Sequence, residues 1–105
     1  MKNKEPTASE IENKAMFIIE KVCSYFGITL QDLTSKKKPA QIVKARHLAV
    51  YMIKIKMDMP YVKIGELINR DHTSCIYAMD KVEAELIHPV DRSYKNYIEQ
   101  INMTL

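Results

Sequence analysis

Five adjacent residues in the second half of the chain, Asp71 to Cys75 with the sequence DHTSC, are of types that enzymes use as acids, bases, nucleophiles or metal ligands. A catalytic triad needs such groups to converge on one point from different chain segments. Consecutive residues at the start of a helix project in different directions around its axis, so they do not converge. The sequence also has neither a GxxxxGKS/T phosphate-binding loop nor a GxSxG nucleophile motif. We therefore predict that the protein is not an enzyme.

The same cluster does not have the pattern of a metal site. His72 and Cys75 are three residues apart, so on a helix they could share one ion. Structural zinc normally takes four ligands in paired spacings, and the other candidates, His47, His88 and Cys23, are scattered along the chain. We expect no metal and no cofactor. The two cysteines form no CxxC pair, and we expect both to be free thiols in a reducing cytoplasm.

Composition predicts the kind of scaffold that carries this cluster. The chain has 105 residues, which is enough for one domain with one core. Hydrophobic residues make up 47%, and there are only two glycines and four prolines. These values favour helices joined by short turns, and we predict a compact all-α bundle of five to six helices. No apolar run approaches the ~20 residues of a membrane span.

Apolar residues at helical spacing begin close to the N-terminus and predict the first helix. Ser9 precedes Glu12 by three residues, which is a capping-box pattern, and Gly27 supplies a stop. Residues 1–8 are expected to be a disordered tail and residues 9–105 a single domain. A short segment, ITLQDLTS, has room for one or two further helical turns. The apolar positions of the first helix are Ile11, Ala15, Ile18, Ile19, Val22 and Phe26.

A basic loop and a largely apolar helix follow. The formal charge is +3, and clustering of that charge indicates an anionic partner. The lysines of the SKKK segment lie in an exposed loop, and Pro39 opens a helix over about residues 39–58. Arg46 lies off the narrow polar stripe of this helix, so we expect its guanidinium to have a partner or to extend past the helix end. The stripe comprises Lys44, His47, Tyr51, Lys54 and Asp58.

Two helices at about 61–68 and 72–87, separated by the turn NRD, form a predicted helix-turn-helix. In that motif the first residues of the second helix contact base edges in the DNA major groove. Asp71 is expected to cap the helix as well, and Asp91 to cap a last helix. One side of the second helix is apolar, with Cys75, Ile76, Ala78, Met79, Val82 and Leu86. The other side carries Thr73, Tyr77, Lys81 and Ala84.

The segments YFGITLQDLTSKKK, IVKARHLAVYM and VKIGELINRDHTSCIYAMDKV resemble the C-terminal DNA-binding domain of the chromosomal replication initiator DnaA, over about residues 16–86. The resemblance implies a helix-turn-helix bundle that binds a short asymmetric duplex site, the DnaA box. It implies base contacts by Lys38 in the minor groove and by Asp71, His72 and Thr73 in the major groove. With the basic cluster, it implies phosphate contacts by Lys36, Lys37, Lys44, Arg46, His47, Val62, Lys63, Arg70, Ser74, Tyr77 and Lys81.

The sequence departs from the family pattern at four places. Lys38 stands where the family usually has arginine, and Tyr77 stands where it often has histidine. Asp80 introduces an acid where a basic residue is common, and the turn is one residue short. Lysine lacks the planar guanidinium that narrow minor grooves favour. These differences imply an altered site preference or a lower affinity.

We therefore expect sequence-specific binding of double-stranded DNA by a monomer. The protein would regulate replication initiation or transcription in a bacterium, a phage or a mobile element, near the nucleoid. Replication initiators carry an ATPase domain, for which 105 residues leave no room, and the start MKNKEP favours a natural short protein. The alternative is a helical protein-interaction module that binds a replication initiator and has little DNA affinity.

Overall fold

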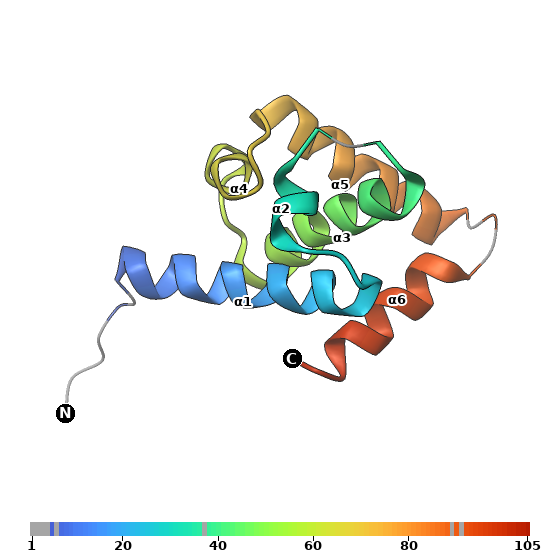
Figure 1. Cartoon of the computed structure of the whole chain (residues 1–105), viewed down its shortest axis with the longest axis horizontal. Coiled ribbons are helices and arrows are strands. Elements are labelled where there is room, and N and C mark those ends of the chain that lie inside the picture. The colour runs from blue at the N-terminus through green and yellow to red at the C-terminus, as the bar shows by residue number, and fades with distance from the viewer. Residues whose placement is uncertain (1–4, 6, 37, 89, 91) are drawn as a thin grey trace.

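The computed structural model describes residues 5, 7–36, 38–88, 90 and 92–105, and over these it contains six α-helices and no strand (Figure 1). This confirms the predicted all-α fold and the boundaries of the predicted helix-turn-helix. Within the same residues, no helix is both long enough and apolar enough to cross a membrane. The helices are α1 (Ala8–Phe26), α2 (Leu30–Thr34), α3 (Ala40–Met57), α4 (Tyr61–Ile68), α5 (His72–Ile87) and α6 (Ser93–Asn102).

The capping box of α1 lies two residues earlier than predicted. The Thr7 hydroxyl accepts a hydrogen bond from the Glu10 amide at 3.1 Å, and the Glu10 carboxylate accepts one from the Thr7 amide at 2.8 Å. The prediction of Ser9 as the cap is therefore wrong. Both Thr7–Glu10 and Ser9–Glu12 have the required spacing, and the earlier box lets Ala8 and Ser9 join the helix. Gly27, with φ of 68°, ends the helix as predicted.

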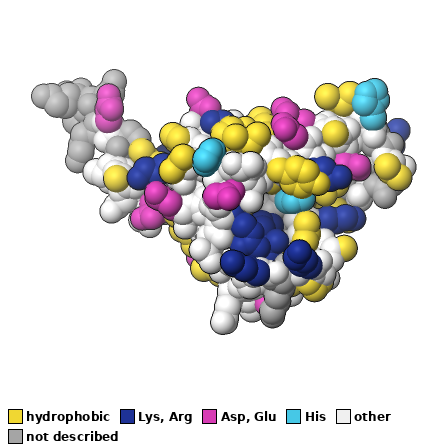
Figure 2. All heavy atoms as spheres, turned by 90° about the horizontal axis from the view of Figure 1, so that it is seen from above, with side chains coloured by type: hydrophobic (Ala, Val, Ile, Leu, Met, Phe, Trp, Pro, Cys, Tyr) yellow, Lys and Arg dark blue, Asp and Glu magenta, His cyan; other side chains and the backbone are white. Residues whose placement is uncertain are grey.

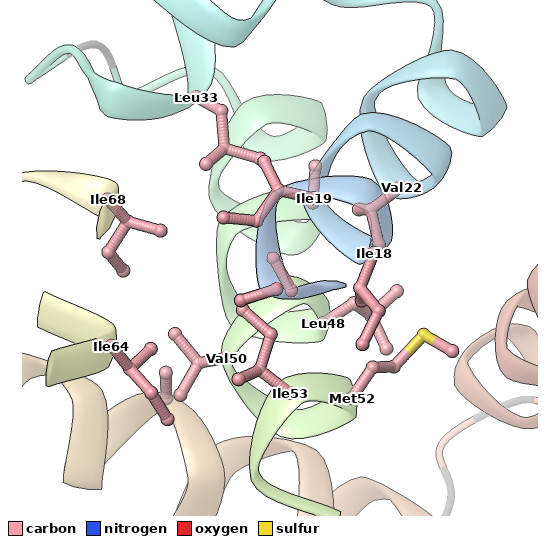
Figure 3. Packing of buried hydrophobic residues seen from close by; sticks show 14 of the residues in the cluster. Ile18, Ile19, Val22, Leu33, Leu48, Val50, Met52, Ile53, Ile64 and Ile68 are labelled. Atoms are coloured by element: carbon pink, nitrogen blue, oxygen red, sulfur yellow. The ribbon is translucent and has the colours of Figure 1, made fainter. Parts of the chain in front are cut away.

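Helix α3 is the centre of the fold, because it packs against α1, α2, α4 and α5. Most of its circumference is buried, which confirms the prediction of a thin polar stripe. Figure 3 shows apolar side chains from α1, α2 and α4 converging on this helix. The residues that meet there include Ile19, Leu33, Leu48, Ile53, Ile64 and Ile68, each with no more than 1% of its surface exposed.

Helix α5 buries a narrower face than predicted. Cys75, Ala78, Met79 and Val82 are buried, but Ile76 is 40% exposed, so its assignment to the inner face is wrong. Successive residues of an α-helix are about 100° apart, which places position 76 at the edge of the stripe centred on Cys75. Both cysteines of the chain are free and buried, and burial raises the pKa of each thiol to about 11.

Helix α6 returns across α1 through aromatic contacts. The Tyr97 ring lies edge-on to the Phe26 ring with centroids 5.1 Å apart, and Tyr94 is buried beside it. The residue before the helix is Arg92, whose side chain makes no capping hydrogen bond. Asp91, the predicted cap, lies outside the described residues. Helix α6 thus packs against α1 and α5, while α1, α4 and α5 each pack against α3 (Figure 1).

Candidate nucleic-acid interface

The turn between α4 and α5 has three residues and passes directly over a glycine. Asn69 ends α4 in the left-handed conformation, with φ of 61°, and the Arg70 amide donates to the Gly65 carbonyl oxygen at 2.9 Å. A Cβ atom on Gly65 would lie 2.2 Å from the Arg70 carbonyl oxygen. Glycine at position 65 therefore permits the close approach of the turn to α4.

The start of α5 presents four polar side chains to solvent. The Asp71 carboxylate accepts a hydrogen bond from the Ser74 amide at 2.8 Å, which confirms that Asp71 caps the helix. The same bond lowers the pKa of Asp71, so the carboxylate is ionised at neutral pH. Asp71, His72, Thr73 and Ser74 are all exposed. Their position at the helix start leaves them accessible to a partner, as the sequence predicted.

The outer face of α5 continues from these residues along a groove of about 410 Å³. Tyr77 is 57% exposed, and its ring meets the His47 ring of α3 edge-on with centroids 5.9 Å apart. Arg46 and Arg70 also line this groove, together with Thr73. Lys81 is exposed one turn beyond Tyr77. The fold thus brings predicted site residues from α3, the turn and α5 to one surface.

The basic loop after α2 is tied to this surface by Arg46. The Arg46 side chain is 8% exposed, and it donates from Nε to the Leu33 carbonyl at 2.8 Å and from Nη2 to the Ser35 carbonyl at 3.0 Å. These bonds confirm that the off-stripe arginine has partners. Its pKa is lowered by burial and then by the nearby charge of Arg70. Arg46 is therefore a cation that supports the loop from within the protein.

The lysines of the loop lie beside this network. Lys36 and Lys38 are exposed, and Lys37, also predicted to contact phosphate, lies outside the described residues. Seen from the side that carries the start of α5 and the α2–α3 loop, lysine and arginine side chains gather near a histidine (Figure 2). The positive charge of the chain is thus clustered, as a surface that binds an anionic partner requires.

Five described residues predicted to contact phosphate do not line the groove, namely Lys36, Lys44, Val62, Lys63 and Lys81. The Lys44 ammonium lies about 6 Å from the ring centroids of Tyr94 and Tyr97, on the α6 side of α3. Lys63 is exposed and lies 3.8 Å from the Glu66 carboxylate. Val62, in the first turn of α4, lines a separate hollow of about 340 Å³ that also includes His72. Lys63 and Val62 lie on α4, the first helix of the helix-turn-helix, whereas Lys44 lies on α3, outside the motif.

Two residues that shape the site were not predicted as parts of it, namely Gly65 and Asn69. Gly65 is a glycine inside an amphipathic helix, a position where close backbone approach is a usual reason for the residue. Asn69 follows the last apolar position of α4, and asparagine tolerates the left-handed conformation that ends a helix. Both signals were present in the sequence.

His47 gives the site a pH-dependent contribution to stability. Burial, then the charges of Arg46 and Lys81, lower its pKa below the usual value of about 6.5. The unfolded chain therefore takes up this proton before the folded one, and stability falls as pH drops below about 6.5. We expect His47→Gln to reduce the loss of unfolding free energy between about pH 7.5 and about pH 5.5, measured by urea titration. An equal loss in both proteins would contradict the depressed pKa.

A short turn between two helices, an exposed polar start of the second helix and an adjoining basic loop define a helix-turn-helix protein. Residues 16–82 match the family model described as bacterial dnaA protein helix-turn-helix. The chain belongs to this family.

Several curated relatives are named chromosomal replication initiator protein DnaA. The one from Acholeplasma laidlawii is 40% identical over 87 residues, which are 82% of this chain and 20% of that protein. The one from Caldanaerobacter subterraneus is 36% identical over 84 residues, 80% of this chain and 18% of that protein. The one from Lacticaseibacillus casei is 40% identical over 70 residues, 66% of this chain and 16% of that protein. The chain therefore spans a fifth or less of the length of these relatives.

Proposed function

We propose that the protein binds double-stranded DNA sequence-specifically, at a site like the DnaA box, and thereby regulates replication initiation or transcription without a catalytic step. The observation that carries the proposal is the exposed start of α5, Asp71 to Ser74, beside a basic loop and the groove that Arg46 and Tyr77 line. Membership in the bacterial dnaA helix-turn-helix family supports it. A partner such as a replication initiator is compatible with this function.

Base contacts are assigned to the first residues of α5. In the major groove an aspartate accepts from the amino group of cytosine, a threonine methyl packs on the thymine methyl, and a histidine donates to guanine. Asp71, Thr73 and His72 are exposed and have these groups. Lys38 is assigned to the adjacent minor groove, because the loop that carries it lies next to the helix-turn-helix. Lysine there would favour A·T-rich flanks less than arginine does.

Phosphate contacts are assigned to the residues around this centre. Ser74, Tyr77 and Lys81 extend from the start of α5, and His47 lies against Tyr77. Contacts to phosphate oxygens set the orientation of the protein on the duplex and supply most of the nonspecific affinity. The remaining assigned residues are Lys36, Lys37, Lys44, Arg46, Val62, Lys63 and Arg70.

A direct binding measurement tests the proposal. The complete chain is titrated into a fluorescent duplex that carries a DnaA box and into a scrambled duplex of equal length and composition, at moderate salt. We expect tighter binding to the first duplex. A selection from random duplexes then defines the preferred site without any assumption about its sequence. Equal and weak binding to all duplexes would overturn the proposal and favour a protein-interaction module.

His72→Ala and Thr73→Ala are each expected to cost ~1–3 kcal/mol of binding free energy on the preferred duplex and to relax its sequence choice. The reason is that each loses one base contact while the phosphate contacts remain. Lys36→Gln is the matched control, because it should weaken all duplexes alike and flatten the log–log salt dependence by about one unit. If His72→Ala left both affinity and preference unchanged, the base-contact assignment would be wrong.

Asp71→Asn separates helix capping from base contact. Asparagine caps helices about as well as aspartate, so the melting temperature should stay nearly the same. An asparagine amide can both donate to and accept from adenine, whereas a carboxylate only accepts. We therefore expect the base preference at one position to move from cytosine toward adenine in a selection from random duplexes. An unchanged preference would limit Asp71 to capping.

A further inference from the structure

The end of α2 is held by side chains from two other elements. The last carbonyl groups of a helix have no partner within the helix, so they need donors from elsewhere. Arg46 of α3 donates to the carbonyls of Leu33 and Ser35. From the turn of the helix-turn-helix, Arg70 donates through Nη2 to the same Ser35 carbonyl at 2.5 Å. Two arginines distant in sequence thus meet at one carbonyl oxygen.

Asn69 adds a weaker contact beside Arg70. Its side-chain amide nitrogen lies 3.4 Å from the Thr34 carbonyl oxygen, which is long for a hydrogen bond. We call Arg46, Asn69, Arg70 and the three carbonyls of residues 33–35 the carbonyl clamp. The carbonyl clamp ends at Ser35, which is the first residue of the SKKK segment. It therefore anchors the basic loop where the loop begins.

The guanidinium of Arg70 is held by hydrogen bonds to two backbone carbonyl oxygens. Its Nη1 donates to the Asn69 carbonyl at 3.0 Å while its Nη2 donates to the Ser35 carbonyl. Both terminal nitrogens therefore contact backbone oxygens, and the side chain is partly buried. Arginine suits this position because its planar fork presents several donors at fixed angles, whereas a lysine ammonium is a point charge on a flexible stem.

We propose that Arg70, supported by Asn69, is a positioning residue that fixes the basic loop relative to the start of α5. This inference rests on the proposed DNA binding and adds a source of specificity to it. Lys38 in one groove and His72 in the next can bind one duplex together only if their spacing is held. Ordering a free loop on binding costs conformational entropy, so a loop anchored in advance binds with less loss. The carbonyl clamp supplies that anchor between the two base-contacting elements.

A proteolysis measurement tests the clamp without DNA. Trypsin cleavage within residues 36–38 is followed by mass spectrometry in Arg70→Gln, in Asn69→Gly and in the control Arg92→Gln, an exposed arginine directly before α6. We expect cleavage to be about tenfold faster in Arg70→Gln, as the loss of a charged hydrogen bond implies. Asn69→Gly keeps the left-handed conformation and should show a smaller increase. Unchanged cleavage in Arg70→Gln, at an unchanged melting temperature, would overturn the proposal.

A binding measurement tests the consequence for specificity. In a selection from random duplexes, Lys38→Ala should lose base preference at some positions of the site. Those positions define the part of the site that the loop contacts. Arg70→Lys keeps the charge but not the fork, and we expect discrimination at those positions to fall about tenfold. Preferences that depend on His72 should persist. A uniform loss of affinity over all duplexes would make Arg70 a phosphate contact only and overturn the positioning role.

The two measurements also separate this inference from the proposed function. If the wild-type chain selected no duplex, the proposed function would fail, and the proteolysis of Arg70→Gln would still decide whether the carbonyl clamp holds the loop. If the loop loosened while discrimination by Arg70→Lys stayed unchanged, the clamp would exist but would not act on specificity, and the inference would be wrong.

Discussion

Gly65→Ala is expected to lower the free energy of unfolding by ~1–3 kcal/mol, the usual cost of forcing an extra carbon into a filled space. The added Cβ would lie 2.2 Å from the Arg70 carbonyl oxygen, a backbone atom that moves only if the whole turn moves. Helix propensity alone predicts the opposite sign, because alanine is favoured over glycine by ~1 kcal/mol inside a helix. The sign of the change in unfolding free energy, measured by urea titration, therefore shows whether helix propensity or the contact with the turn dominates.

The same substitution should weaken DNA binding, because the turn carries Arg70 and positions Asp71. Glu66→Ala on the same helix is the control. Glu66 is exposed, and its ion pair with Lys63 is on the surface, so its stability should change by no more than ~0.5 kcal/mol. A Gly65→Ala variant as stable as the wild type would show that the turn has room to shift.

Arg46→Met is expected to lower the free energy of unfolding by ~2–3 kcal/mol. Methionine keeps much of the aliphatic volume but removes the donors to the Leu33 and Ser35 carbonyls, and a buried group left without its partner costs ~1–3 kcal/mol. The unfolding free energy of Arg46→Lys should lie between those of the wild type and Arg46→Met, because one ammonium replaces a fork of donors. Chemical denaturation at neutral pH measures all three.

Lys56→Met is the matched control for this prediction, since Lys56 is an exposed cation on the same helix. Its unfolding free energy should stay within ~0.5 kcal/mol of the wild type. If Arg46→Met were equally mild, the guanidinium would contribute no net stability to the end of α2.

Features governed by near neighbours in the chain followed from the sequence. Pro39 preceded α3, Gly27 ended α1, and the turn NRD separated α4 from α5 at the predicted residues. Each depends on backbone angles or hydrogen bonds within a few residues, so the local sequence is sufficient. The polar cluster at residues 71–74 was located for the same reason, because its members are adjacent and Asp71 caps the helix that the other three begin. Their contacts with DNA remain predictions.

The tertiary structure decided what depends on residues far apart in the chain. The partners of Arg46 lie 11 and 13 residues away, and Arg70 joins Ser35 from 35 residues away. The spacing of apolar residues predicts which side chains are buried. It does not predict which distant group a polar side chain contacts, because that depends on how the helices pack. The sequence by itself therefore determined the helices and the exposed polar cluster, and packing around α3 decided which loop stands beside that cluster.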